Sequence, residues 1–197
     1  MKLYYAPGAC SLADHIALHE ANLSFEREQV DLKTKRTESG ANYLEINPKG
    51  YVPALAIQGG QVLTENIAIL DWIASQAPAL SPQVELGRTR LLEMLAFIST
   101  EIHKSYKPFF AGGSEADKAK AADMLGKRFA QIAEMFEGDY LFGERVSAAD
   151  AYLFVMLTWA DRMGVAIPDE LDRFKQRMMS RPAVIAALKH EGLLQGA

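Results

Sequence analysis

The pattern of this chain changes near residue 77, and that change limits the folds it can adopt. Before it, strand-like and helix-like segments alternate with short connections, which is typical of a layered α/β domain. Ala77–Pro82 then carries two prolines and no apolar period, as a linker between domains does. Every later segment has helical spacing. We therefore predict an α/β domain over residues 1–77, a linker over 78–86 and an all-helical domain over 87–197.

The first domain contains several strand candidates. They are Lys2–Tyr5, Phe25–Leu32, Pro53–Ile57 and Gln61–Leu63. Between the first two, apolar residues recur at helical spacing until Asn22. Gln58-Gly59-Gly60 between the last two is typical of a tight hairpin. The expected order is β-α-β, a loosely helical link, then β-β-α.

The second domain shows apolar residues at helical spacing. Leu91–Tyr106 predicts one long helix, and Ala130–Phe136 lies on another. Tyr152–Met163 is nearly all apolar, so we expect that helix in the middle of a bundle.

Composition argues against several classes of partner. Lys and Arg total 21 against 25 Asp and Glu, and a net charge of −4 is unlike that of a nucleic-acid binder. No apolar stretch approaches the length of a membrane span, and Pro7-Gly8 interrupts any signal-peptide pattern. We therefore expect no nucleic-acid or membrane partner. A single cysteine forms no disulfide within the chain, so we expect a cytoplasmic protein.

That cysteine, Cys10, lies between the strand Lys2–Tyr5 and a helix that begins near Ser11. Backbone N–H groups and the dipole at a helix N-terminus stabilise a thiolate, so a lowered pKa is expected there. The alternative is an inert, buried cysteine that acts as a small hydrophobic residue.

Several motifs extend the pattern around Cys10. They are Met1–Tyr5, Pro7–Leu12, Asn47–Gly50 followed by Val52–Leu55, Leu63–Glu65 and Ser147–Tyr152. With these motifs the chain resembles the bacterial beta-class cytosolic glutathione transferases over essentially its whole length. The Pro-Gly-Ala-Cys-Ser segment is the most diagnostic, because relatives outside this class use serine or tyrosine. The resemblance implies a thioredoxin-like N-terminal domain, an all-α helical-bundle C-terminal domain and a homodimer.

The resemblance also implies a glutathione site in each subunit, with glutathione as co-substrate and no prosthetic group. The Val52-Pro53 bond is cis in the family, which leaves the Val52 backbone free to pair with the cysteinyl part of glutathione. Thr64 is a plausible N-cap and Glu65 an acidic first-turn residue, and a helix N-terminus of this kind binds anions. In the family this turn holds the γ-glutamyl carboxylate, and Asn66 stands where relatives often carry Ser or Gly.

Three further residues match positions of the family that contact glutathione or line the cleft. Lys35, in a short basic run, matches a lysine that binds the glycyl carboxylate. Glu101 matches an acidic residue that reaches the glutathione ammonium from the other subunit. His103 matches a histidine that lines the active cleft.

Two other arrangements have simpler interpretations. His15 and His19 stand at i and i+4, but no third ligand accompanies them in the sequence, so no metal site is expected. Ser147 and Asp150 have the spacing of a helix capping box, not of a catalytic pair.

The predicted function is conjugation of reduced glutathione to small hydrophobic electrophiles, with Cys10, Ser11 and His103 as candidate catalytic residues. Cys10 is also suited to a mixed disulfide, so glutathione-dependent thiol–disulfide exchange is a second activity to consider. A non-enzymatic glutathione-binding or regulatory protein of the same fold is the alternative. Aromatic residues that could line the electrophile pocket, or belong to the core, are Tyr106, Phe109, Phe110 and Trp159.

Overall fold

The structure, a computed structural model, describes residues 1–194. Its first part is a sheet with strand order β3-β2-β1-β4-β5. The strands are β1 (Lys2–Tyr5), β2 (Glu26–Asp31), β3 (Arg36–Thr37), β4 (Ala54–Ala56) and β5 (Val62–Thr64). β1 is parallel to β2 and antiparallel to β4. The helices of this part are α1 (Ser11–Glu20), α2 (Tyr43–Ile46) and α3 (Asn66–Gln76), and the predicted thioredoxin-like domain is confirmed.

The predicted strands are present with small shifts at their ends. β1 has the predicted bounds, and β4 and β5 pair as a hairpin through the turn η1 (Gln58–Gly60). The short strand β3 was not predicted, because Arg36–Thr37 lies in a basic, polar run with no strand pattern.

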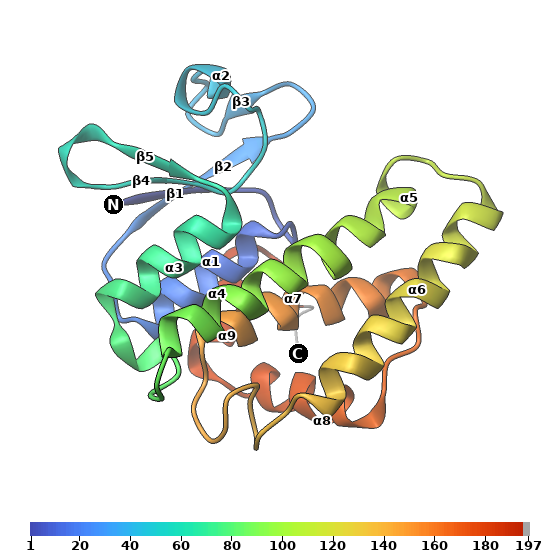
Figure 1. The fold of residues 1–197 in the computed structure, drawn as a ribbon. Helices are drawn as coiled ribbons and strands as arrows, with labels where there is room; N and C mark the ends of the chain where they lie inside the picture. Colours follow the sequence, from blue (N-terminus) through green and yellow to red (C-terminus); the bar gives the residue numbers. More distant parts are fainter. Residues whose placement is uncertain (195–197) are drawn as a thin grey trace.

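The second part is helical, as predicted (Figure 1). Its elements are η2 (Pro78–Leu80), α4 (Gly87–Phe97), η3 (Ile98–Ile102), η4 (His103–Tyr106), α5 (Lys107–Phe110), α6 (Glu115–Glu134), α7 (Ala148–Met163), α8 (Asp169–Met179) and α9 (Pro182–His190).

The prediction of one regular helix through Leu91–Tyr106 is wrong. After α4 the chain passes through a π-helical turn, η3, and a 3₁₀ turn, η4, before α5. Pro108 lies in the first turn of α5; proline donates no backbone hydrogen bond, and in a regular helix its ring would clash with the carbonyl of Lys104, four residues earlier. The irregular turns therefore carry Glu101 and His103 on a locally distorted backbone.

The two parts share one hydrophobic core. α7 lies in the middle of the helical part, as expected, and nearly all of its side chains are buried (Figure 1). On the other side α1 packs against α3, α7 and α9, so α1 connects the sheet domain to the helical domain. Among residues 1–194, no helix combines the length and apolar character that crossing a membrane requires.

The capping box predicted at the start of α7 is present. The Asp150 Oδ2 atom accepts hydrogen bonds from the Ser147 backbone N–H at 2.7 Å and from the Ser147 hydroxyl at 2.6 Å. The Asp150 Oδ1 atom accepts from the Leu141 backbone N–H at 3.0 Å. Asp150 therefore fixes both the start of α7 and the loop before it.

Candidate active site

Cys10 is the residue directly before α1, and its side chain is half-buried. Its Sγ atom lies 3.5 Å from the carbonyl oxygen of Val52, which precedes β4. The Val52-Pro53 peptide bond is cis. The start of α1 and the chain leading into β4 thus meet at the thiol.

The lowered pKa expected for Cys10 is wrong. Burial raises the pKa of the thiol to about 12, and the carboxyl group of Asp14, one helical turn later, adds to the rise. The backbone N–H groups of Cys10 and Ser11 lower the pKa but do not outweigh these effects. Cys10 is therefore a thiol, and a hydrogen-bond donor, at neutral pH.

Ser11 is fully buried, and its hydroxyl is used inside the protein. The Oγ atom accepts from the Ala6 backbone N–H at 3.2 Å and lies 3.4 Å from the Ala6 carbonyl oxygen. These contacts close the turn between β1 and α1. The geometry argues against the expected role of Ser11 as a donor to a bound sulfur.

The loop before Cys10 is held by the helical domain. Trp159 on α7 donates from Nε1 to the Gly8 carbonyl at 2.8 Å, and the Gly8 N–H donates to Glu191 Oε2 at 2.9 Å. Gly8 has φ +67, and a Cβ there would lie 3.1 Å from an Arg162 nitrogen. The backbone conformation favours glycine at this position, whereas the flexible Arg162 side chain could shift to make room for a Cβ.

The start of α3 forms a second side of the site. The N-cap is Glu65 and not Thr64 as predicted, because Thr64 is the last residue of β5. Glu65 has φ +75, a conformation that side chains other than glycine rarely adopt and that occurs often at ligand-binding sites. Its carboxylate accepts from Lys49 Nζ at 2.6 Å and from the Tyr51 hydroxyl at 3.3 Å.

Asn66 joins α3 to α1 through buried polar contacts. With its amide nitrogen turned toward the acceptors, it donates to the Cys10 carbonyl at 3.3 Å and to Asp14 Oδ2 at 2.6 Å. Asp14 is fully buried, and burial raises its pKa well above the usual value. Asp14 was not among the predicted site residues, although its i, i+4 spacing from the N-cap Cys10 places the two side chains on the same side of the start of α1.

Lys35 and Glu101 lie at the margins of this arrangement. The Lys35 Nζ atom donates to the Gly50 carbonyl, so the lysine reaches the loop that leads to Val52. Glu101 forms an ion pair with Arg128 of α6, whose nitrogen lies 2.6 Å from its carboxylate. Both side chains are partly exposed.

His103 is held by two residues of α7. Its Nδ1 atom lies 2.6 Å from the Tyr152 hydroxyl, and its ring packs edge-on against Trp159 at 5.0 Å between centroids. Burial, helped by Lys104, lowers the pKa of His103 to about 4, so the imidazole is neutral at pH 7. Tyr152 is a site residue that the sequence analysis did not identify, although its hydroxyl stands out in an apolar helix.

The aromatic candidates divide between pocket and core. Phe110 is exposed and lines an open pocket of about 530 Å³ together with His103, Lys104, Lys107 and Ala111. Trp159 lies beneath Phe110, with 4.8 Å between ring centroids. Tyr106 is fully buried and donates to the Met156 carbonyl at 2.8 Å, so it belongs to the core.

The comparisons with known proteins agree with this geometry. Residues 9–76 match the family model of the glutathione S-transferase N-terminal domain, and residues 92–182 match that of the C-terminal domain. Glutathione S-transferase GstA of Escherichia coli O157:H7 is 40% identical over 98% of this chain and 100% of its own length. A sphingomonad glutathione S-transferase complexed with glutathione superposes with a TM-score of 0.92 and 45% identity, over 98% of this chain and 100% of the other.

A beta-class glutathione S-transferase of Sphingomonas chungbukensis gives a TM-score of 0.90 and 42% identity, again over 98% of this chain and 100% of the other. The resemblance to the bacterial beta class is therefore confirmed, and the chain belongs to the glutathione S-transferase family.

Proposed function

We propose that this protein conjugates the thiol of reduced glutathione to small hydrophobic electrophiles. The observation that carries the proposal is the meeting of three elements at Cys10. Its Sγ atom lies 3.5 Å from the Val52 carbonyl, and the Asn66 amide donates to the Cys10 carbonyl at 3.3 Å. The starts of α1 and α3 and the chain leading into β4 therefore surround one thiol. The helix starts offer anion sites and the extended chain offers backbone partners, and a small anionic peptide such as glutathione needs both.

Each part of glutathione has a partner in this arrangement. The Val52 backbone pairs with the cysteinyl unit, and backbone N–H groups at the start of α3, beside Glu65 and Asn66, receive the γ-glutamyl carboxylate. Lys35 binds the glycyl carboxylate. Glu101 reaches the ammonium of the glutathione bound to the second subunit of a homodimer.

The chemistry follows from the protonation states at the site. Cys10 keeps its proton, so it does not repel the glutathione thiolate as a second anion. On glutathione binding its one S–H hydrogen turns from the Val52 carbonyl to the thiolate and donates a weak hydrogen bond there. Tyr152 keeps its proton, because burial raises its pKa. In the His103 tautomer that accepts this proton at Nδ1, the imidazole carries its own proton on Nε2. That N–H is a second donor toward negative charge on the sulfur.

The pocket lined by His103, Lys107 and Phe110 receives the electrophile. Proximity of the two reactants and stabilisation of the thiolate then supply the rate. The cytoplasm is the expected location, because its reducing conditions keep glutathione in the thiol form.

The test combines binding and turnover. We expect the wild-type protein to be retained on glutathione-agarose and to conjugate a halonitroarene. A protein that is retained but shows no turnover with any electrophile would favour the non-enzymatic binder. We expect Cys10→Ala to keep most of the conjugation activity, and complete loss with glutathione binding intact would show that Cys10 acts directly. Sedimentation velocity tests the homodimer.

A further inference from the structure

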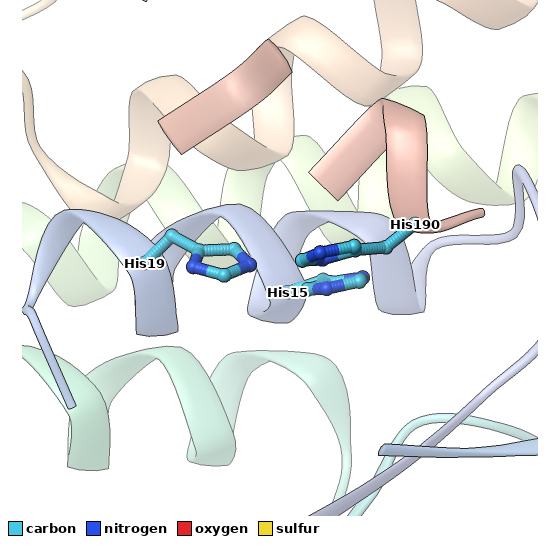
Figure 2. A group of neighbouring side chains, drawn as sticks. All are labelled: His15, His19 and His190. Atoms are coloured by element: carbon cyan, nitrogen blue, oxygen red, sulfur yellow. The ribbon is translucent and has the colours of Figure 1, made fainter. Parts of the chain in front are cut away.

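Three of the four histidines of the chain gather where α1 packs against α9. His15 and His19 are one turn apart on α1, and His190 is the last residue of α9 (Figure 2). One ring nitrogen from each lies within 4.8 Å of the others. No third ligand was expected because His190 is 171 positions beyond His19, and only the fold brings them together.

Two of these imidazoles have unused nitrogen atoms. The Nε2 atoms of His15 and His19 are buried and have no hydrogen-bond partner among residues 1–194. Buried polar atoms are nearly always paired, so two unpaired nitrogens in one cluster call for an explanation. The ring of Phe25 packs edge-on against both and closes one side of the cluster.

His15 is oriented as a metal ligand would be. Its Nδ1 atom lies 2.9 Å from Glu191 Oε1, and the other carboxylate oxygen accepts from the Gly8 N–H. His15 Nδ1 and Glu191 Oε1 share one proton, and burial raises the pKa of Glu191 to about 8. In the tautomer with this proton on Nδ1, Nε2 presents its lone pair, which is the usual outer-shell support of a metal-binding histidine. This contact with Glu191 therefore fixes the position of the His15 ring.

We propose that His15, His19 and His190 form a site for a divalent transition metal ion of the Zn²⁺, Co²⁺ or Ni²⁺ type. Imidazole is a preferred ligand for these ions, and three histidines leave a further position for water. The site is separate from the glutathione cleft, and it does not depend on the proposed transferase activity.

Binding requires the imidazole rings to approach one another and to rotate out of their stacked arrangement. Tetrahedral Zn²⁺ with Zn–N bonds of about 2.0–2.1 Å places its nitrogen ligands about 3.3 Å apart, whereas the separations here reach up to 4.8 Å. The His190 side chain is exposed and that of His19 is half-buried, so both can turn toward the fixed His15. The ring planes of His15 and His190 are now stacked at 13°, and this rotation would replace stacking with coordination.

A bound ion would connect the two domains. α1 belongs to the sheet domain and α9 to the helical domain, and the two helices pack against each other. An ion that binds the folded protein and not the unfolded chain raises the melting temperature. We therefore expect the thermal midpoint to rise with Zn²⁺ or Ni²⁺ concentration.

The test uses protein without a histidine tag and without glutathione in the buffer. Titration with Co²⁺, followed by visible absorption, and calorimetry with Zn²⁺ should show one ion per chain. His19→Ala and His190→Ala should each weaken binding at least tenfold, because each removes one of three ligands. Both side chains reach the surface, and circular dichroism verifies that the variants fold.

His103→Ala is the matched control, since His103 is the fourth histidine of the chain and lines the pocket with Phe110 and Lys107, not the histidine cluster. It should leave metal affinity unchanged, and so should Cys10→Ala. The proposal is overturned if the double variant His19→Ala/His190→Ala binds as tightly as the wild type. It is also overturned if the wild type binds no ion, or if only His103→Ala or Cys10→Ala abolishes binding.

Discussion

The Sγ atom of Cys10 lies 3.5 Å from the carbonyl oxygen of Val52, a contact that only a protonated thiol makes favourably. Burial and the neighbouring Asp14 both raise the pKa of this thiol. The diagnostic cysteine of the chain is therefore a donor at rest, and not the activated nucleophile that its position at a helix N-terminus predicts. Its use in disulfide exchange requires a change of environment, such as the arrival of glutathione.

The first prediction concerns the titration of Cys10. With a pKa raised to about 12, the thiol should react with iodoacetamide at pH 8 much more slowly in the native protein than in urea. The thiolate absorbance of the native protein should appear only well above pH 9. Because the folded-state pKa is raised, the stabilisation from the thiol is complete below its unfolded pKa and is lost as the pH rises toward 12. Equal alkylation rates in the two states would contradict this assignment.

The second prediction concerns Tyr152 and His103. Tyr152→Phe removes the hydroxyl 2.6 Å from His103 Nδ1 and should lower kcat for conjugation by roughly tenfold, as loss of about 1–1.5 kcal/mol implies. The pKa of His103 is lowered to about 4, so its imidazole stays neutral near pH 6.5. The pH profile of wild-type kcat should therefore show no drop in activity near pH 6.5 from protonation of a histidine. Tyr140→Phe is the control, because its hydroxyl contacts Arg181 away from the cleft. An unchanged kcat in Tyr152→Phe would remove His103 from the mechanism.

The third prediction concerns the bond from Trp159 to the Gly8 carbonyl. Trp159→Phe keeps an aromatic ring but leaves this carbonyl without its 2.8 Å donor, which should cost about 1–3 kcal/mol of unfolding free energy. The loop that carries Cys10 loses a support, so KM for glutathione should rise. Trp72→Phe, at the chain's other tryptophan, is the control in both measurements. A stable Trp159→Phe with normal KM would show that the hydrogen bond is dispensable.

Features set by neighbouring residues were predictable from the sequence. β1 has the predicted bounds because an alternating apolar run is followed at once by Pro7-Gly8. The Ser147 and Asp150 capping box depends on a spacing of three residues and is present as expected. The family resemblance added the residues expected to bind glutathione, and three of these, Cys10, Val52 and Asn66, lie together in the structure.

Features set by distant residues were not predictable in this way. The raised pKa of Cys10 depends on how deeply the thiol is buried, and no local pattern reports that depth. His190 and Glu191 reach His15 only because α9 packs along α1. The distortion ahead of Pro108 differs from these, because a proline in a helical run is a local signal in the sequence.

Two capping boxes in this chain place the same chemistry in opposite environments. Ser114 and Asp117 begin α6 on the surface, and the hydrogen bonds from Ser114 lower the pKa of Asp117. Ser147 and Asp150 begin α7 in the interior, and burial raises the pKa of Asp150 to about 6, against the opposing effect of its hydrogen bonds. The two aspartates should therefore respond to pH with opposite signs.

The fourth prediction is the response of Asp117→Ala and Asp150→Ala to acid. The pKa of Asp117 is lower in the folded protein than the unfolded value of 3.8, so its ionised carboxylate stabilises the fold above that pH. The loss of unfolding free energy caused by Asp117→Ala should therefore shrink as the pH falls below 3.8. The pKa of Asp150 is raised to about 6 in the folded protein, so the stabilisation from its protonated form is complete below pH 3.8 and is lost as the pH rises through about 6. The loss caused by Asp150→Ala should therefore be larger at pH 4 than at pH 7, by up to about 3 kcal/mol. Urea unfolding at both pH values measures each difference, and parallel behaviour of the two variants would refute the contrast between them.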